Sequence, residues 1–534
     1  MAAASTTAGW PASADSTSAV PSRWPETLMT AIPSEIPPLK LHTKLFYALG
    51  AVANAVKGRG LATFLMIFYN QVVGLPPATV SGVLMVALIF DAFVDPLVGQ
   101  VSDNFRSKFG CRHPFMYAAA LPVSLAYFLL WNPPGGWSDE AVVIWLVACL
   151  LTVRLFDTFF ELPSSALAPE LTRDYNERTS LISMRAFFTV VGGLGMTVAA
   201  YQYFLAENPD GSGGILARDG YLAYSAVSAV LIFVVILAST AGTHSRIPYL
   251  SRPPTRKITL KAMAREVAHT LNNRAFVIAT LTGMFIAVAA GSKNGLEIYF
   301  ALYFWELTQS QLAILTAVSV AGSLGGVMVA PHIARLLGKK RGAILMFASA
   351  LAVGITPITL RLIGLMPPNG ADLLFWILLT ETFFNSGMAV ATGVMLVSMV
   401  ADVVEDAEVK TGRRSEGLLM SADNLFKKIV SGVGIFIAGA VLSLVSFPEG
   451  ARRGEVDPAI LQNMGLIYLP LVTLLYGLGI VCLSMFNIDK AKHEDNLRIL
   501  DEAGAKASAA AQDARDANSD ILPGTASAPL GSKA

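Results

Sequence analysis

Runs of about twenty apolar residues, the length an α-helix needs to cross the hydrocarbon core of a bilayer, recur along this chain of 534 residues. A sliding window of about nineteen residues places these runs near residues 45–70, 78–99, 115–132, 141–166, 181–205, 219–242, 275–304, 310–334, 342–365, 372–400, 419–446 and 464–487. The pattern therefore predicts an all-α integral membrane protein with twelve transmembrane helices.

Basic residues gather in every second loop between these runs. The loops after the second, fourth, sixth and eighth runs contain the sequences NFRSKFGCRH, RDYNERT, SRPPTRKITLKAMAREVAH and RLLGKKRG. The intervening loops, among them QVVGLPPA, NPPGGWSDE and MPPNGAD, have almost no Lys or Arg. Because loops rich in Lys and Arg stay on the cytoplasmic side, we predict that both chain termini are cytoplasmic.

The long loop after the sixth run divides the chain into two sets of six spans, and the basic residues Arg112 and Lys339 follow the second and eighth runs at corresponding positions. Two halves of this kind are typical of a transporter whose site lies between them at the bilayer midplane. The predicted organisation is a disordered tail over 1–43, a six-helix bundle over 44–242, a linker over 243–274, a second six-helix bundle over 275–487, and a polar, largely disordered tail over 488–534.

Composition agrees with a membrane protein and excludes several functions. Hydrophobic residues make up 54% of the chain and charged residues only 14%, against about 25% in soluble domains. The net charge of +1 gives no field that would attract nucleic acid. The three cysteines match no metal or disulfide spacing. No P-loop motif is present, so an ion gradient rather than ATP would drive transport by this chain.

Charged residues also lie inside the predicted spans. A charge at the centre of a span costs roughly 2.5–3.5 kcal/mol, so each one needs an opposite charge or a water-filled cavity. The acidic residues in such positions are Asp91, Asp95, Asp157, Glu161, Glu297, Glu381 and Asp423, and the basic ones are Lys57, Arg59, Arg154, Arg185, Lys293, Lys427 and Lys428. Their near-equal numbers predict that charges compensate one another between helices.

Asp91 and Asp95 stand one helical turn apart in the second span and share a face. Two carboxylates this close in a low dielectric cannot both stay ionised without compensation. Either one is protonated or a cation lies between them, and oxygen ligands suit Na⁺, Li⁺ or H⁺. Thr158 in the fourth span offers a third, neutral oxygen. These three residues are therefore a candidate site for Na⁺ or H⁺, and a static ion pair with Lys427 or Lys428 is the alternative.

Two further pairs inside the spans have both a structural and a functional interpretation. Lys293 and Glu297, at i and i+4 in the seventh span, either neutralise each other or contact the substrate. Arg154 and Asp157 in the fourth span are as consistent with a structural pair as with a functional one.

Three stretches of the chain carry a family resemblance: LIFDAFVDPLVGQVSDNFRSKFG, ELPSSALAPELTRDYNERTSLISMR, and MVADVVEDAEVKTGRRSEG followed by NLFKKIVSG. They resemble the glycoside-pentoside-hexuronide:cation symporters of the major facilitator superfamily, from about residue 44 to 487. The resemblance implies the major facilitator fold with two six-helix bundles.

The resemblance also implies roles for individual residues. It assigns the cation site to Asp91, Asp95 and Thr158. It assigns contact with sugar hydroxyls to Glu161, with Arg185 beside the sugar. It places Lys428 close to the cation site, with the neighbouring Lys427 and Asp423 as further coupling candidates.

The first span departs from the family pattern. The resemblance implies that a galactoside-transporting member of the family carries an aspartate for its sugar where this chain has Ala55, and Lys57 and Arg59 appear nearby. This loss of a negative charge and gain of positive charge favours an acidic sugar such as a hexuronide, with Lys57, Lys293 and Glu297 as additional substrate-binding candidates.

Together these observations predict a secondary active transporter of the cell (inner) membrane. Its expected function is Na⁺- or H⁺-coupled symport of a sugar or glycoside by alternating access, with no cofactor besides the coupling ion and no obligatory protein partner. The alternatives are transport of another anionic or amphipathic substrate such as a lysolipid, and a non-transporting sensor on the same frame. An enzyme is not expected, because the spans contain no metal cluster and no nucleophile with its base.

Overall fold

The computed structural model describes residues 37–172, 174–207, 213–250, 274–411 and 416–486, with a few isolated positions between 495 and 509. The helices of these ranges belong to one compact unit that begins at Leu39. Most of the predicted tails and of the predicted linker lies outside the described residues. The first helix begins at Leu41, just inside the tail predicted over 1–43.

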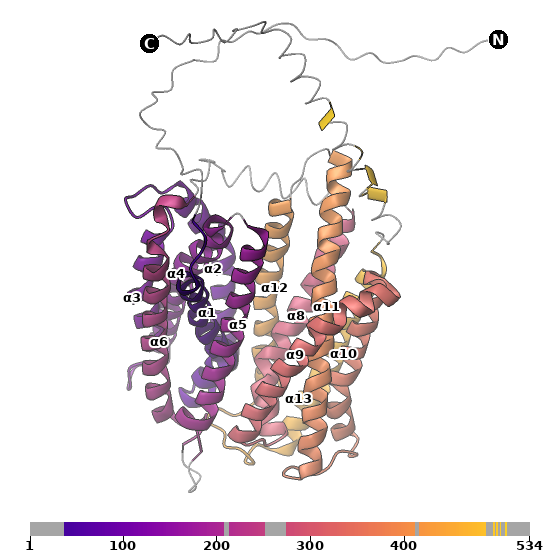
Figure 1. Cartoon of the computed structure of the whole chain (residues 1–534). Coiled ribbons are helices and arrows are strands. Elements are labelled where there is room, and N and C mark those ends of the chain that lie inside the picture. Colours follow the sequence, from indigo (N-terminus) through magenta and orange to yellow (C-terminus); the bar gives the residue numbers. More distant parts are fainter. Residues whose placement is uncertain are drawn as a thin grey trace, which may run out of the picture. The chain divides into compact units, whose positions relative to one another are not determined.

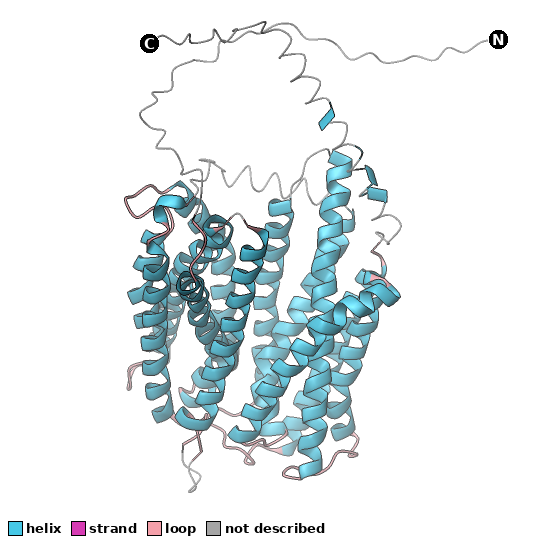
Figure 2. Cartoon of the chain, viewed as in Figure 1, coloured by secondary structure: helices cyan, strands magenta, loops and turns pink. Residues whose placement is uncertain are grey.

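All the long elements of the described chain are helices (Figure 2). The first six are α1 (Leu41–Ile67), α2 (Pro77–Asn104), α3 (His113–Leu130), α4 (Asp139–Leu171), α5 (Tyr175–Ala199) and α6 (Arg218–His244). The next six are α8 (Arg274–Tyr299), α9 (Gln309–Leu337), α10 (Lys339–Leu362), α11 (Asp372–Thr411), α12 (Glu416–Leu444) and α13 (Pro458–Ser484). By length and composition, 12 helices of the described chain can cross a membrane, which confirms the predicted spans.

The contacts between helices divide them into two groups of six (Figure 1). In the first group α1 packs on α5 and α6, α3 packs on α4 and α6, and α2 packs on α4. In the second group α8 packs on α12 and α13, and α11 packs on α9 and α10. The main contact between the groups joins α2 to α12. A side chain at Gly439 of α12 would place its Cβ 2.6 Å from the carbonyl oxygen of Pro77, so glycine permits this close approach.

Local sequence explains where several helices begin and end. Ser138 and Asp174 accept hydrogen bonds from the first turns of α4 and α5, as expected of N-cap residues. Thr308 and Gln311 form a capping box at the start of α9. Gly338, with φ of 78°, separates α9 from α10, because glycine tolerates this left-handed region.

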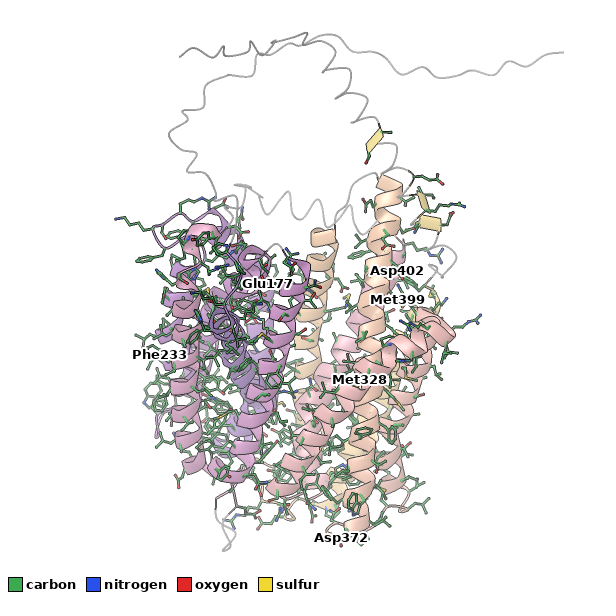
Figure 3. The ribbon with its side chains drawn as sticks, viewed as in Figure 1. Glu177, Phe233, Met328, Asp372, Met399 and Asp402 are labelled. Atoms are coloured by element: carbon green, nitrogen blue, oxygen red, sulfur yellow. The ribbon has the colours of Figure 1, made fainter. Side chains whose placement is uncertain are left out.

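We call the end at which α2, α4 and α9 finish the basic end, and the opposite end the neutral end. Figure 3 shows Asp372 near the neutral end of α11 and Asp402 toward its basic end. At the basic end Arg112 pairs with Glu170 at 2.6 Å, and Lys339 pairs with Asp402 at 2.6 Å. In each half, a basic residue that follows one span binds an acidic residue toward the basic end of another span, α4 in the first half and α11 in the second. The two ion pairs therefore match the predicted repeat.

Two short π-helical turns at corresponding positions of the halves face each other at the neutral end. One is η2 (Phe68–Val72), which continues α1, and the other is η5 (Phe300–Phe304), which continues α8. Such turns occur often at functional sites. Together with Tyr299, the last residue of α8, they carry the side chains that join the two groups of helices here.

These side chains form a hydrogen-bonded cluster that we call the outer clasp: Asn70, Gln71, Tyr299 and Tyr303, with the backbone of Pro448 and Ala451. Tyr299 donates to Asn70 Oδ1 at 2.8 Å. Gln71 donates to the Pro448 carbonyl at 3.1 Å and accepts from the Ala451 amide at 2.9 Å. Asn70 and Gln71 are buried, so opening this end breaks the hydrogen bonds of their side-chain amides with the second group of helices. The clasp therefore favours closure of the neutral end.

We predict that Gln71→Ala shifts the protein toward a state open at the neutral end. The substitution leaves polar partners of Gln71 unsatisfied at a cost of about 1–3 kcal/mol, which changes the closed-to-open ratio roughly 5- to 150-fold. Spin labels at Gly135→Cys and Asp372→Cys, in a background with the native cysteines replaced, report this change as a longer interspin distance. Gly135 has open space for the label and Asp372 is exposed.

Asn132→Ala is the matched control. Asn132 also lies near the neutral end, but its amide donates within the first group, to Phe128 and Ser225. The interspin distance distribution of Asn132→Ala should equal that of the wild type. Equal distributions for Gln71→Ala and wild type would show that the outer clasp does not hold this end closed.

Candidate functional site

Charged side chains from α1, α2, α4, α5 and α12 meet in the interior of the bundle. We call this set the charge cluster: Lys57, Asp91, Asp95, Arg154, Asp157, Thr158, Glu161, Arg185 and Lys428. Helical spacing places the members from α2 on one side and those from α4 on the side that packs against α2. The cluster holds four acidic and four basic side chains, so it is neutral as a whole.

Asp91 is the buried member of the carboxylate pair, with its side chain 6% exposed. Arg154 Nη1 donates to Asp91 Oδ2 at 3.1 Å. Lys428 Nζ lies 3.2 Å from the same oxygen. Asp91 is therefore compensated by one cation from its own helix group and by one from the other.

Asp95 is the more accessible carboxylate, with its side chain 30% exposed. Thr158 Oγ1 donates to Asp95 Oδ1 at 2.8 Å, and Lys428 Nζ donates to Asp95 Oδ2 at 2.6 Å. The structure thus brings together Asp91, Asp95, Thr158 and Lys428, as the sequence predicted. It also realises the alternative of an ion pair, since Lys428 links the two groups of helices through these carboxylates.

Lys427 does not join the carboxylate pair. Its Nζ pairs with Asp423 one turn earlier on α12, and its stem crosses Gly283 of α8, where a Cβ would lie 2.1 Å from Lys427 Cε. Of the two adjacent lysines, the fold directs only Lys428 to the aspartates. Lys427 and Asp423 form a pair within α12 instead, and the stem of Lys427 packs on α8.

Lys57 lies inside the bundle with its side chain 5% exposed, and it pairs with Asp157 of α4. Asp157 was a predicted neighbour for Arg154 on the same helix, but the structure gives each of them a partner on another helix. The charge of Lys57 is therefore neutralised within the protein. Its predicted contact with substrate remains a prediction, and the ion pair gives it a structural role.

Glu161 and Arg185 form a bridge between α4 and α5. Arg185 Nη2 donates to Glu161 Oε1 at 2.6 Å, and Arg185 Nη1 donates to Ser164 Oγ at 2.9 Å. The guanidinium also lies over the ring of Tyr47. Glu161 Oε2 is buried with no hydrogen-bond partner in the described chain. A buried carboxylate oxygen without a donor is costly, so this atom is ready to accept from a bound hydroxyl group.

Arg59, two residues beyond Lys57, is a cation that the sequence-based site did not select. Its side chain is exposed close to the middle of the span Leu41–Val72, and its stem contacts Gly193 of α5. No ion pair or hydrogen bond of Arg59 occurs within the described part of the chain. The sequence could indicate Arg59 only by its position inside the span, which it shares with Lys57. The structure distinguishes the two residues, because Lys57 is buried and Arg59 is exposed.

A second polar group lies on α8 and α11. Lys293 Nζ donates to Asn385 Oδ1 at 2.7 Å, and Asn385 donates to the Ala350 carbonyl at 2.8 Å. Among the described residues no ion pair joins Lys293 to Glu297, although one turn separates them. Glu297 is exposed within its span and lies within electrostatic range of Tyr201 of the other helix group. The second group of helices therefore also presents polar side chains toward the first.

The described residues contain no group of three or more His, Cys, Asp or Glu side chains suited to a metal ion. The oxygens of Asp91, Asp95 and Thr158 suit a monovalent cation by their chemistry. Such an ion would be a transported substrate. Lys428 bonds to the carboxylate oxygens that the ion would use.

The fold and the charge cluster define a twelve-span transporter of the major facilitator type. A solved structure of the xylose transporter XylE from E. coli in an inward-open conformation resembles the chain with a TM-score of 0.55, covering 86% of this chain and 98% of that one, at 14% identity. Apolar side chains on the outer surface, such as Met328 at 73% exposure (Figure 3), are those expected of a multi-pass membrane protein facing lipid.

The family of MFS/sugar transport proteins matches residues 46–490, and this chain belongs to it. The match confirms the resemblance to the glycoside-pentoside-hexuronide:cation symporters. The isoprimeverose transporter of Lactiplantibacillus pentosus is 24% identical, over 88% of this chain and 92% of that protein. A protein of Escherichia coli K12 named as a glycoside/cation symporter is 25% identical, over 90% of this chain and 99% of its own length.

We predict that Lys57→Met strongly destabilises the protein and that adding Asp157→Leu restores most of the loss. Removal of one partner leaves a buried charge uncompensated, at a cost of about 3–5 kcal/mol, whereas replacing both partners by apolar residues is often neutral. Thermal unfolding of the purified variants measures both effects. Equal losses in the single and double variants would contradict a structural pair between Lys57 and Asp157.

Proposed function

We propose that the protein is a cation-coupled symporter of a glycoside that works by alternating access in the cell membrane. The observation that carries this proposal is that Glu161, whose Oε1 is held by Arg185, lies in one charge cluster with the carboxylates of Asp91 and Asp95, on the adjacent helices α4 and α2. The membership of the sugar-transport family and the relatives named for glycosides support it. The distribution of basic loops supports a cytoplasmic location for both termini.

Substrate binding would centre on Glu161 and Arg185. Glu161 Oε2 accepts a sugar hydroxyl, while Arg185 holds Oε1 in place from 2.6 Å. A carboxylate and a guanidinium fixed in this way give planar, directional hydrogen bonds to a polyol. Tyr47 is buried beneath the guanidinium of Arg185 and helps to hold it in place. Lys293 and Glu297 would contribute from the second group of helices.

Coupling would depend on the contacts of Lys428. A cation that binds Asp95, Asp91 and Thr158 takes the place of the Lys428 ammonium. This removes an ion pair between the two groups of helices and changes the free-energy difference between the states of the transporter. The membrane potential supplies about 2.3 kcal/mol per charge per 100 mV. Coupling is reciprocal, so a cation that tightens substrate binding is itself bound more tightly with substrate present.

Arg59 favours a substrate with an acidic group. The basic members of the charge cluster are paired with carboxylates, whereas Arg59 has an exposed guanidinium without an ion pair in the described chain. An unpaired intramembrane charge is expected to face a cavity and to serve function. A hexuronide or another acidic glycoside would satisfy both Glu161 and Arg59.

We predict that Glu161→Gln lowers substrate uptake at least about tenfold, since a hydrogen bond to a charged group contributes about 1.5–3 kcal/mol. Uptake into proteoliposomes is measured for radiolabelled isoprimeverose, lactose, a glucuronide and a lysophospholipid under combined Na⁺ and pH gradients. Ser165→Ala is the control, because its hydroxyl bonds within α4. Accumulation of the lysophospholipid alone, or full uptake by Glu161→Gln, would overturn the glycoside assignment.

Arg59→Gln should reduce uptake of the glucuronide and leave uptake of an uncharged glycoside at the wild-type level. The reason is that the variant removes a charge and retains hydrogen-bonding capacity. Competition between a glucuronide and its uncharged methyl ester separates the effect of charge from that of shape. Equal loss for both compounds would show that Arg59 does not select for an acidic group.

A further inference from the structure

Glu381 of α11 lies inside a membrane span and has no ion pair among the described residues. Its side chain is half-buried. Within the described chain its carboxyl group accepts one hydrogen bond, a long one of 3.4 Å from the neighbouring Thr382 Oγ1. We propose that Glu381 binds hydroxyl groups of the substrate from the second group of helices, as Glu161 does from the first. This inference rests on the proposed function, because it concerns the binding of the same glycoside.

The missing ion pair is the first reason to assign a role to Glu381. An acidic side chain inside a span is expected to have a partner or to face a water-filled cavity, where it serves function. Each acidic member of the charge cluster has a basic partner. Glu381 has none in the described chain, although Lys293 of α8 lies within electrostatic range of it. The carboxyl oxygens of Glu381 are therefore available to a ligand.

Asn385 explains why Lys293 does not pair with Glu381. Lys293 Nζ donates to Asn385 Oδ1 at 2.7 Å, and Asn385 Nδ2 donates to the Ala350 carbonyl of α10 at 2.8 Å. Asn385 is buried, so its amide is fixed at both ends. At Gly354 a Cβ would lie 2.6 Å from Asn385 Nδ2, so glycine makes room for this amide. Asn385 is therefore a positioning residue that holds the Lys293 ammonium beyond ion-pairing distance of Glu381.

The same contacts direct Glu381 toward the first group of helices. Glu381 and Asn385 stand at i and i+4 on α11 and share a face, and this face meets α8 through Lys293. Glu297 stands one turn beyond Lys293 on α8. It lies within electrostatic range of Glu381 and of Tyr201. Because Tyr201 lies just beyond the end of α5, the face with Glu381 is close to the interface between the two groups.

The charges around Glu381 favour hydroxyl groups as its ligand. Glu297 is a second acidic residue within electrostatic range of Glu381. An acidic group of the substrate placed here faces two carboxyl groups, which opposes its binding. A hydroxyl group donates to a carboxyl oxygen without adding charge. An acidic glycoside therefore binds with its acidic group toward Arg59 of α1 and with other hydroxyl groups toward Glu381.

A glycoside bound to both Glu161 and Glu381 links the two groups of helices. Glu161 Oε1 is held by Arg185 of the first group, and Oε2 is left for the substrate. Glu381 belongs to α11 of the second group. A substrate that contacts both carboxyl groups binds more tightly to the state in which the groups approach each other, and so shifts the population toward that state. Glu381 thereby contributes to closure around the substrate as well as to affinity.

Reaction with a water-soluble thiol reagent tests the position of Glu381 without any substrate. Glu381→Cys is made in the full chain, in a background with the native cysteines replaced, and is treated with sulfonatoethyl methanethiosulfonate. Phe383→Cys is the control, because Phe383 is exposed and apolar and lies on another side of the same helix. Glu381→Cys should react at least about tenfold faster, since the reactive thiolate forms in water rather than in lipid. Equal rates at the two positions would overturn the proposal.

The affinity for glycosides measures the contact itself. Isothermal titration of the purified full chain with isoprimeverose, lactose and phenyl β-D-glucuronide identifies the probe that binds the wild type. Glu381→Gln should bind this probe at least about tenfold more weakly, because a bond to the carboxyl group is lost. Glu381→Asp provides a second variant if the glutamine variant does not fold. Asp372→Asn is the matched control, since it removes an exposed carboxyl group at the neutral end of the same helix, and it should bind as the wild type does.

Single-deoxy analogues of this probe separate contact from a structural effect. Removal of one particular hydroxyl group should weaken binding by the wild type at least about tenfold and leave binding by Glu381→Gln unchanged, since the partner is already absent. Removal of a different hydroxyl group should show the same relation to Glu161→Gln. A loss in Glu381→Gln that is the same for every analogue would refute direct contact.

Asn385→Ala tests the positioning role. This variant releases Lys293 to pair with Glu381, so the affinity for the probe should fall. Adding Glu381→Gln should cause no further loss, because residues that act through one contact are not additive. Additive losses would show that Asn385 does not act through Glu381.

These measurements distinguish failure of this inference from failure of the proposed function. Binding of a glycoside that depends on Glu161 but not on Glu381 would overturn the role of Glu381 alone. Absence of binding by the wild type to every glycoside probe would refute the proposed function, and the role of Glu381 with it.

Discussion

The cost of holding charge inside a membrane-spanning bundle is the constraint on which this structure depends. An unpaired ion in such a setting costs several kcal/mol, and here each acidic member of the charge cluster has a basic partner on another helix. The pairs join α1 to α4, α2 to α4, α4 to α5 and α2 to α12. Charge compensation thus links helices that apolar packing alone would leave free to slide, since lipid is as apolar as the helix surfaces.

These ion pairs differ in whether their partners move together. Lys57 with Asp157 and Arg185 with Glu161 stay within the first group of helices. Lys428 is the member that crosses to the second group. Any event that neutralises Asp95 therefore acts on the interface between the bundles, and the same interaction serves both binding and conformational change. This double role explains why a partly exposed carboxylate lies next to a buried one.

The outer clasp acts on the same interface from the neutral end. Its hydrogen bonds from Tyr299 of α8 and Tyr303 of η5 to η2 are uncharged, so an ion or proton at Asp95 does not alter them directly. The two sets of contacts therefore contribute separate terms to the stability of one state, each of about a few kcal/mol. A transporter needs such modest terms, because a substrate and an ion can then shift the population between states.

Apolar periodicity and the positions of charged residues along the chain were enough to determine the spans of this protein and one face of its charge cluster. Runs of about twenty residues defined the twelve spans, and spacing of i and i+4 placed Asp91 and Asp95 on one face. Sequence patterns do not say which helix faces meet, because they fix a side chain only relative to its own helix axis. The family resemblance placed Lys428 near the aspartates, but only the tertiary structure paired Lys427 with Asp423 instead. Only the tertiary structure gave Arg154 to Asp91 and Lys57 to Asp157, and left Arg59 exposed. The physical reason is that burial and ion pairing are properties of contacts between helices.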